Sequence, residues 1–368
     1  MRDWVALNMT RGIGPRAAAK LLERFGSAEA VYRATRAELE GVRLLPEAVG
    51  SIIAKDLHDK AEAEIKNVRA LGGDLLVLDD GVYPALLREI YDPPIVLYVK
   101  GAWSACLDQP CVAIVGSRRC STYGQNAALM LARDLAQRGV TIVSGFARGI
   151  DAAAHRGALE AGGRTVAVLG TGIEENYPRD HRQLGQEILA AGGAMVSQFP
   201  LGTPPVSENF PYRNRVISGL SLGAVVVEAA ENSGSLITAR LALEANREVF
   251  AVPGSPLDAR ASGTNRLLKD GATLVTSAAD IAEVLTPILG LSMPPAILEP
   301  REDEKAEPPL ADDQLRTRII GLLGRAPISI DDLVREADAP PGTVHIVLLE
   351  LELAGKLERH GGGLVSLA

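Results

Sequence analysis

The sequence is poor in aromatic residues, cysteines and lysines. Phe, Trp and Tyr make up 4% of its 368 residues, so a base-stacking platform built from many rings is not expected. The three cysteines have no paired spacing, which favours a reducing compartment over a disulfide framework. Only eight of the 38 basic residues are lysines, and none lies between positions 101 and 268. A GC-rich genome can cause such a bias, but arginine also offers a planar fork that suits phosphate, so the positions of the arginines must decide.

Signals for membranes and metals are missing as well. No apolar run has the length of a membrane span, and the first ten residues lack a signal-peptide profile. The five histidines are scattered without the spacing of metal ligands. We therefore expect a cytoplasmic protein without metal or cofactor. The net charge of −8 is only weak evidence against a nucleic-acid partner, because binding depends on local patches.

The stretch IVGSRRCSTYG, residues 114–124, has the outline of a phosphate-binding turn between a strand and a helix. It lacks both the G-x-G-x-x-G of dinucleotide sites and the G-x-x-x-x-G-K-[ST] of P-loops, so ATP hydrolysis is poorly supported. Asp151 and His155 stand four residues apart after Ser144, but a nucleophile triad needs an activated serine on a G-x-S-x-G elbow, and we expect no such elbow in this chain. We interpret Asp151 as a charge at a helix start and His155 as a loop-bonding residue, and expect no catalytic residues.

The chain divides into four expected segments. These are a helical domain (1–66), an α/β domain (67–290), an acidic Pro-rich linker (291–313) and a small C-terminal domain (314–368). In the first, helical spacing on both sides of Gly12-Ile13-Gly14 resembles a helix-hairpin-helix or SAM-like module, whose backbone N–H groups can contact phosphate. A helical module that only packs or binds protein is the alternative. The C-terminal domain reads as three helices and a β-wing, the order of a winged helix.

The α/β domain is expected to be an extended Rossmann-like parallel sheet with helices on both faces. Continuous apolar runs alternate with amphipathic helices, as in such sheets. The runs are CVAIVG, VTIVSG, RTVAVLG, GAMVSQF, GAVVVEA, EVFAVPG and ATLVT, with DLLVLDD and IVLYVKG as added strands at one edge.

Polar and basic loops follow several of these strands. Ligands of open parallel sheets bind beyond the carboxyl ends of the strands, where helix N-termini favour anions. The candidates are Gly116, Ser117, Arg118, Arg148, Arg213, Asn214, Arg215, Ser233, Gly234 and Ser235. Several such loops at one sheet edge predict an anionic ligand, with the arginines as charge-assisted phosphate ligands.

The motifs VGSRRCSTYG, SGFARGIDAAAH, ENFPYRNRVISGLS, ENSGSLITA and AVPG, in this order, resemble the DNA-processing protein A (DprA/Smf) family. The resemblance implies single-stranded DNA binding, protection of incoming DNA during natural transformation and loading of the RecA recombinase. It also implies a homodimer formed through the Rossmann-like domain and no established catalytic activity. The basic DNA pocket of the family carries over to Arg118, Arg213 and Arg215, and a basic position after the A-H pair to Arg156. The matching Gly145, Gly149, Asp151 and His155 are expected to shape the loop, and Arg119 is not given the role of Arg118.

Two departures from the family pattern stand out. Gln198 replaces the glutamate of the usual S-E-x-P, which puts in doubt any role that depends on a charge there. The expected recognition helix, 341–354, has no Lys or Arg but has Glu350 and Glu352, whereas a reading helix normally brings Arg, Lys, Asn or Gln to base edges. We therefore expect this domain to be a poor reader of duplex DNA and a protein-contact or accessory element.

Our leading hypothesis is a non-catalytic single-strand binder whose affinity is sequence-tolerant and steeply salt-dependent. Candidates for base stacking are Tyr123, Phe146, Phe210 and Tyr212. The alternative is a Rossmann-like nucleotide phosphoribohydrolase, although that class has P-G-G-x-G-T where this chain has ENSGSLITA. A purely structural adaptor is disfavoured by the arginines that follow the strands.

Overall fold

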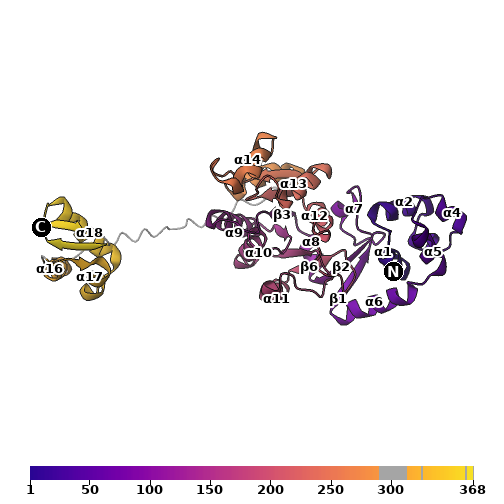
Figure 1. Ribbon diagram of the computed structural model, residues 1–368, viewed down its shortest axis with the longest axis horizontal. Helices are drawn as coiled ribbons and strands as arrows, with labels where there is room; N and C mark the ends of the chain where they lie inside the picture. Colours follow the sequence, from indigo (N-terminus) through magenta and orange to yellow (C-terminus); the bar gives the residue numbers. More distant parts are fainter. Residues whose placement is uncertain (290–312, 325, 361–362, 368) are drawn as a thin grey trace. The chain divides into compact units, whose positions relative to one another are not determined.

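The computed structural model describes residues 1–289, 313–324, 326–360 and 363–367 (Figure 1). The chain divides into two compact units, Met1–Ala296 and Ile297–Ala368. Almost all of the expected linker, 291–313, lies outside the described residues. None of the helices in the described part of the chain combines the length and apolarity needed to cross a bilayer.

Six helices form the N-terminal part of the first unit, next to the β1–β2 strand pair (Figure 1). They are α1 (Arg2–Met9), α2 (Pro15–Phe25), α3 (Ala28–Val31), α4 (Arg36–Glu40), α5 (Pro46–Ala54) and α6 (His58–Ala70). The α1–α2 turn depends on Gly12, whose φ of +85° would strain a residue with a side chain. Pro15 then starts α2, where its missing N–H matters least. The expected pair of helices around Gly12-Ile13-Gly14 is present, whereas its identity as a helix-hairpin-helix or SAM-like module stays a prediction.

A nine-stranded sheet follows, in the order β1-β2-β6-β5-β4-β3-β7-β8-β9. Its strands are β1 (Gly73–Val77), β2 (Val96–Gly101), β3 (Cys111–Val115), β4 (Thr141–Ser144), β5 (Thr165–Leu169), β6 (Ala194–Ser197), β7 (Gly223–Val226), β8 (Glu248–Ala251) and β9 (Thr273–Leu274). Strands β3 to β9 are parallel, and β2 and β1 continue one edge in antiparallel pairing. The predicted parallel sheet with two added edge strands is confirmed.

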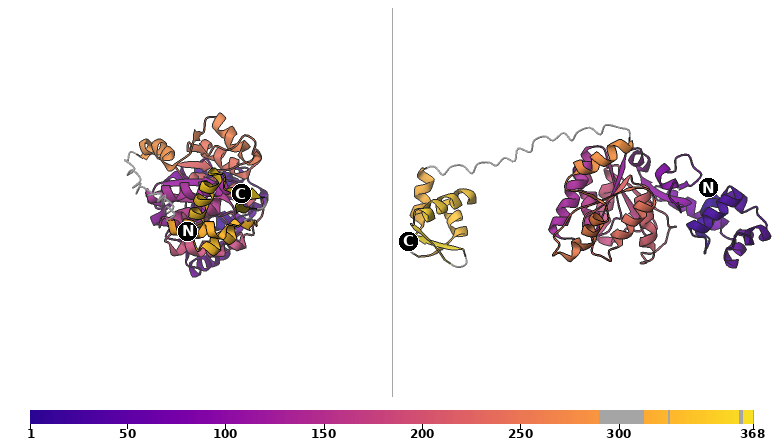
Figure 2. Two further views of the ribbon diagram at one scale, coloured as in Figure 1. Left: turned by 90° about the vertical axis from the view of Figure 1, so that its left-hand side faces the viewer. Right: turned by 90° about the horizontal axis from the view of Figure 1, so that it is seen from above.

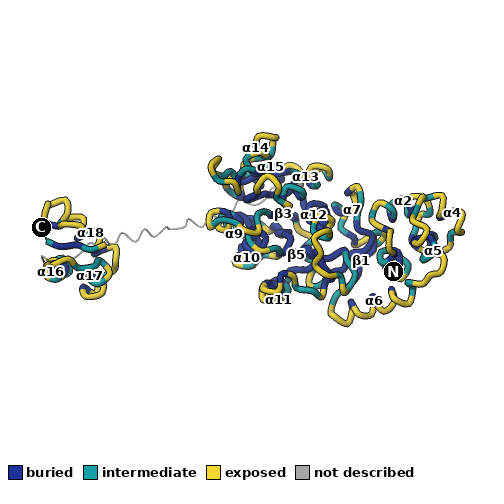
Figure 3. Tube along the Cα trace, viewed as in Figure 1, coloured by how far each residue is buried: buried dark blue, intermediate teal, exposed yellow. Residues whose placement is uncertain are grey.

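Helices cover both faces of this sheet (Figure 2). The helices of this part are α7 (Ala85–Arg88), α8 (Trp103–Leu107), α9 (Thr122–Gln137), α10 (Ile150–Glu160), α11 (Arg182–Ala190), α12 (Asn209–Gly219), α13 (Gly234–Glu244), α14 (Ser262–Lys269) and α15 (Ala278–Leu289). Successive strand residues point to opposite faces, so Val112 and Ile114 pack with α9, α10 and α15, while Ala113 and Val115 pack with α12 and α13. The central strands are therefore buried on both sides (Figure 3), which explains their continuous apolar runs.

The strand order reverses between β3 and β7. From β3 the sheet extends through β4 and β5 to β6, and β7 then pairs with the other side of β3 and leads to β8 and β9. Ligands of open α/β sheets bind beyond the carboxyl ends of the strands at such a reversal. The fold therefore places a candidate site just beyond Val115 and Val226, where β3 and β7 end.

The second unit has the expected three helices and wing. Its elements are α16 (Asp313–Leu322), β10 (Ile328–Ser329), α17 (Ile330–Ala337), α18 (Pro341–Leu353), β11 (Leu357–His360) and β12 (Leu364–Leu367). The three strands pair in the order β10-β12-β11. Ile319, Leu333, Val347 and Val365 are buried in a core of its own. This order of elements is a winged helix.

Candidate functional site

A pocket of about 680 Å³ lies where the strand order reverses. It is formed by the segments after β3, β4 and β7 together with the first turns of α12. We call it the switch-point pocket. Its lining includes Gly116, Ser117, Arg118, Asp151, Phe210, Arg213, Asn214, Ser233, Gly234 and Ser235. Eight of the eleven residues predicted from the sequence are among these, so the structure brings most of them together.

The turn after β3 is held from two sides. The Ser117 N–H donates to the Glu228 carbonyl at 2.7 Å, and the Ser117 carbonyl accepts from the Ile150 N–H at 3.2 Å. A Cβ on Gly149 would lie 2.3 Å from the Ser117 oxygen, and Gly149 has a φ of +79°. A Cβ on Gly116 would lie 2.7 Å from Ile150. Both glycines are therefore needed for the close approach that fixes this turn.

Arg118 is the exposed cation of the pocket. Its guanidinium carbon lies 5.1 Å from the centre of the Phe210 ring, within cation–π distance. The neighbouring Arg119 is also exposed but is not part of the lining. An exposed arginine next to an aromatic ring can contact a phosphate and a base at the same time.

Arg213 lines the same pocket but is buried. One of its terminal nitrogens donates to the carbonyls of Gly145 and Val168, at the ends of β4 and β5. Burial lowers the pKa of Arg213 to about 10, while the nearby Asp151 carboxylate acts in the opposite direction. The guanidinium therefore stays charged at neutral pH and joins two strand ends. The sequence predicted an arginine that is free to bind phosphate, whereas the guanidinium of Arg213 is bonded to the protein itself.

Asp151 and His155 are engaged in structural contacts. The Asp151 carboxylate accepts from the Ala147 N–H at 3.2 Å, and burial raises its pKa. His155 Nδ1 lies 2.7 Å from the Thr165 hydroxyl, which itself donates to a strand carbonyl. Burial lowers the pKa of His155 to about 3, so the ring is neutral. Asp151 shapes its loop as expected, whereas His155 bonds to a strand rather than to a loop.

The serines near these residues are also engaged. Ser144 is fully buried, and its hydroxyl donates to the Ile114 carbonyl at 2.6 Å. The sequence does contain one G-x-S-x-G, at residues 219–223, but it connects α12 to β7, the reverse of the strand–turn–helix order of a nucleophile elbow. Ser221 within it is buried and donates to the Ile217 carbonyl at 2.9 Å. Neither serine has the geometry of an activated nucleophile.

The start of α13 faces the pocket. Ser233 is its N-cap, and the Ser233 hydroxyl lies 2.7 Å from the Ser235 hydroxyl. The Asn214 amide donates to the Gly234 carbonyl at 3.2 Å and so joins α12 to this turn. Unpaired N–H groups and the helix dipole make such a start favourable for an anion. Arg118 and the α13 start thus offer two kinds of anion contact in one pocket.

Three predicted residues lie elsewhere, which corrects the expectation of a single crevice. Arg148 forms a two-bond ion pair with the exposed Asp180, at 2.7 and 2.8 Å. Arg156 is exposed on α10 and is not part of the lining. Arg215 lies on the other side of α12 from Arg213, because two residues correspond to roughly 200° around a helix of about 3.6 residues per turn.

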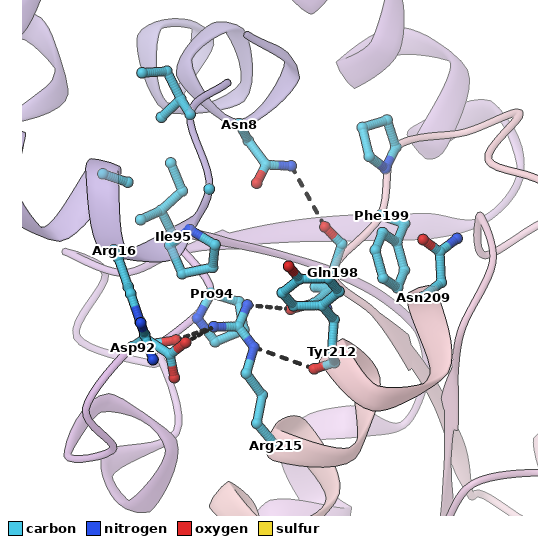
Figure 4. A pocket seen from close by; sticks show the side chains of 15 residues that line it. Asn8, Arg16, Asp92, Pro94, Ile95, Gln198, Phe199, Asn209, Tyr212 and Arg215 are labelled. Atoms are coloured by element: carbon cyan, nitrogen blue, oxygen red, sulfur yellow. Dashed lines mark hydrogen bonds and ion pairs between the residues drawn. The ribbon is translucent and has the colours of Figure 1, made fainter. Parts of the chain in front are cut away.

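Arg215 lines a second cavity, of about 560 Å³, between the α1–α2 turn and α12 (Figure 4). We call it the hairpin cavity, and its lining includes Asn8, Ile13, Gly14, Pro15, Arg16, Asp92, Gln198, Phe199, Asn209, Tyr212 and Arg215. Arg215 is buried, and burial lowers its pKa. It donates to the Gln198 side-chain oxygen at 2.5 Å and pairs with the Asp92 carboxylate at 3.1 Å. Asp92 therefore supplies the negative charge that Gln198 does not carry.

The stacking candidates also separate. Phe210 lines the switch-point pocket and Tyr212 lines the hairpin cavity. Phe146 is fully buried and cannot stack on a ligand, because its ring packs edge-on against His155 and His181. Tyr123 is exposed and donates to the Pro253 carbonyl at 3.0 Å, outside both linings.

Glu228 is a residue that the sequence reasoning missed. It follows β7, is buried, and accepts at 2.9 Å from the N–H of Ser121, the N-cap of α9. A Cβ on Gly124 would lie 2.5 Å from this carboxyl carbon. Its sequence signal is a lone acid at the end of the apolar run GAVVVEA. The Glu228 backbone carbonyl holds the turn after β3, and its carboxylate holds the start of α9, so the residue positions Arg118 from both ends of the turn.

The acids of α18 are paired within the second unit. Glu350 lies 2.5 Å from Arg316, and Glu352 lies 2.9 Å from Arg359. Leu349 and Leu353 on the same helix are 51% and 80% exposed. These features agree with a protein-contact role, and poor duplex reading stays a prediction. As for metals, among the described residues no group of three or more His, Cys, Asp and Glu side chains is placed to hold an ion.

Family models match residues in both units of the chain. The family model of the DNA recombination-mediator protein A matches residues 74–286, and that of the DprA winged helix domain matches residues 303–363. Protein Smf of Escherichia coli is 44% identical over 294 residues, which cover 80% of this chain and 77% of that protein. The DNA processing protein DprA of Streptococcus pneumoniae is 45% identical over 205 residues, 56% of this chain and 71% of that one.

Two solved structures are similar. The X-ray structure of DNA processing protein A from Streptococcus pneumoniae superposes with a TM-score of 0.68 at 34% identity, covering 77% of this chain and 97% of that one. A structure that concerns the single-stranded DNA binding mode of DNA processing protein A from Helicobacter pylori gives a TM-score of 0.52 at 31% identity, covering 58% and 96% of the two chains.

Proposed function

The chain belongs to the DNA recombination-mediator protein A (DprA/Smf) family, and from this premise we propose that it is a cytoplasmic single-stranded DNA-binding protein without catalytic activity. It protects incoming DNA and loads the RecA recombinase onto it in natural transformation or recombination. The relative from Helicobacter pylori, whose structure concerns single-stranded DNA binding, supports the choice of ligand.

The observation that carries the proposal is the mouth of the switch-point pocket. There the exposed Arg118 lies beside the Phe210 ring, and the Ser233–Ser235 turn presents a helix start. Cation and helix start grip phosphates, and the ring offers a stacking surface to any base. Such a site is sequence-tolerant, and its affinity falls with salt because counterions are released on binding.

A fluorescence titration with single- and double-stranded oligonucleotides at two salt concentrations tests this proposal. Arg118→Ala should weaken single-strand binding about tenfold and reduce the slope of log K against log salt by about 0.7, the value for one phosphate contact. Arg119→Ala is the matched control, since it removes the same charge one residue outside the pocket. Equal losses in the two variants would show that only general charge matters.

The absence of catalysis has its own test. Ser144 and Ser221 are buried and bonded to carbonyls, and His155 is neutral and bonded to Thr165. We expect no base release when the protein is incubated with nucleoside monophosphates. Release that exceeds a boiled control would favour the phosphoribohydrolase alternative.

The proposal includes a homodimer formed through the Rossmann-like domain. In support of it, Leu257 in the loop after β8 and Leu274 in the edge strand β9 are 95% and 51% exposed. The double variant Leu257→Glu/Leu274→Glu should shift the mass seen by light scattering from two chains to one.

RecA loading is checked by the assembly of RecA on a strand coated with single-strand-binding protein, with and without this chain.

A further inference from the structure

The hairpin cavity is a second built cavity in the first unit, and the proposed function leaves it unused. Three parts of the chain form it: the α1–α2 turn, the segments next to β2 and β6, and α12 (Figure 4). Its volume of about 560 Å³ lies within the range of small-ligand pockets, roughly 300–1,000 Å³. The cavity therefore has room for a group larger than water.

Helix α12 separates this cavity from the switch-point pocket. Asn209 and Tyr212 line the cavity, whereas Phe210 and Arg213 line the pocket. The two sets alternate because helical spacing turns them to opposite sides. A helix with its side chains is about 10–12 Å across, so one extended strand can pass over the start of α12 and reach both.

The lining combines flat apolar surfaces with amides. Tyr212 is 57% exposed, and Phe199 is half-buried. Asn8 and Asn209 add side-chain amides. Their nitrogens donate to the Gln198 and Pro204 carbonyls at 3.5 and 3.2 Å, and each amide also carries an oxygen acceptor. This combination suits an aromatic heterocycle with hydrogen-bonding edges, which is the chemistry of a nucleobase.

The charge of the cavity wall also suits a base on an anionic backbone. Arg215 is balanced by the Asp92 carboxylate, and its other partners, the Gln198 side chain and the Tyr212 carbonyl, are neutral. Arg16 is exposed at the rim and adds a positive charge. The cavity therefore presents a neutral interior and a cationic edge.

We propose that the hairpin cavity holds one nucleobase of the strand whose phosphates occupy the switch-point pocket. The base lies against Tyr212 and Phe199 with its edge toward Asn8 and Asn209, and Arg16 meets the adjoining phosphate. This inference rests on the proposed function, because the strand is what brings the base to the cavity. It gives the N-terminal helices a part in DNA binding through the α1–α2 turn.

Two variants probe the cavity. Gly14→Trp fills its mouth, and it should fold because a Cβ at Gly14 meets no atom within 4 Å and the φ is −83°. Tyr212→Ala removes the exposed ring, and Tyr212→Phe keeps it. The matched control is Gly81→Trp, at an exposed glycine outside the lining whose added Cβ also meets nothing within 4 Å.

The probes are an oligo-dT strand, a strand of the same length made of abasic sites, and free thymidine monophosphate. Gly14→Trp and Tyr212→Ala should weaken oligo-dT binding roughly tenfold, as expected for one lost base stack. Binding of the abasic strand should not change, Tyr212→Phe should restore affinity, and Gly81→Trp should resemble the wild type.

Several outcomes overturn the inference. Unchanged oligo-dT affinity in both variants, or an equal loss with the abasic strand, would show that no base enters the cavity. Binding of free thymidine monophosphate that Gly14→Trp abolishes, with oligo-dT binding intact, would assign the cavity to a free nucleotide. A wild type that binds none of the strands would instead refute the proposed function, and the inference with it.

Discussion

The two sides of α12 use the same residue type for different work. Arg213 on the pocket side joins two strand-end carbonyls beside the buried Asp151, whereas Arg215 on the cavity side is paired with the partly exposed Asp92 and with Gln198. Neither arginine is exposed, and the exposed guanidinium of the switch-point pocket belongs to Arg118. Buried arginines of a helix motif can therefore hold a site in place, while a different arginine is exposed to the ligand.

Stability should separate the two buried arginines most clearly. Arg213→Ala leaves the buried carbonyls of Gly145 and Val168 without their donor, and each unpaired buried group costs roughly 1–3 kcal/mol, so we expect a loss of about 3–5 kcal/mol in the free energy of unfolding. Arg215→Ala should lose less, about 2 kcal/mol, because the Asp92 side chain is 25% exposed and can be hydrated. Urea unfolding of both variants measures the difference, and equal losses would contradict this comparison.

The free energy of unfolding should also respond to acid through His155, which lies on α10 one turn after the pocket residue Asp151. Its pKa in the folded protein is about 3, below the ordinary 6.5, so the unfolded chain takes up the proton first as the pH falls. The contribution of the neutral His155 to the free energy of unfolding is complete above about pH 6.5 and is lost toward pH 3. Between pH 6.5 and 5 the loss should be about 2 kcal/mol, since one pH unit corresponds to roughly 1.4 kcal/mol.

Urea unfolding across this pH range checks the effect of His155. His155→Gln has no titrating ring, so the part of the pH dependence that comes from this residue should disappear. A wild-type free energy of unfolding that stays level from pH 6.5 to 5 would contradict the assignment.

The cap of α13 should matter less. Ser233→Ala removes the hydroxyl that caps the helix start at the pocket, at an expected loss of about 1 kcal/mol in the free energy of unfolding. Ser233→Gly should lose only a few tenths of a kcal/mol. Thermal and urea unfolding distinguish the two, and an alanine variant as stable as the glycine variant would show that this cap contributes nothing.

The smallest effect should come from charge on the cavity side. Gln198→Glu places a second carboxylate beside Arg215 and makes the wall negative, so oligonucleotide affinity should fall by a few-fold at low salt and less at high salt. Gln183→Glu, an exposed position on α11, is the matched control. A loss of affinity that does not depend on salt, or that is equal in the control, would show that the charge of this wall does not act on the bound strand.

Much of the fold follows from local pattern. The apolar runs of β3 to β8 are continuous, which is typical of parallel strands buried on both faces. The structure covers these strands on both faces, as predicted. The sequence predicts anion contacts at the turn after β3 and at the Ser233–Ser235 turn, because both follow strands that end at one sheet edge. The separation of Arg213 from Arg215 is implied by helical phase, but their motif spans the start of a helix whose boundaries are not fixed by the local pattern.

Pattern in the sequence is enough to predict the alternation of strands and helices, the polar loops at the strand ends, and the preference for Arg118 over Arg119. The fold was needed to show that Arg213 and Arg215 are buried, that Glu228 holds the turn below Arg118, and that a cavity exists between the α1–α2 turn and α12. The two kinds of information differ in range. Periodicity and turn chemistry act over a few residues, whereas the partners of Arg213, Arg215 and Glu228 are up to 123 positions away and are set by the packing of the whole sheet.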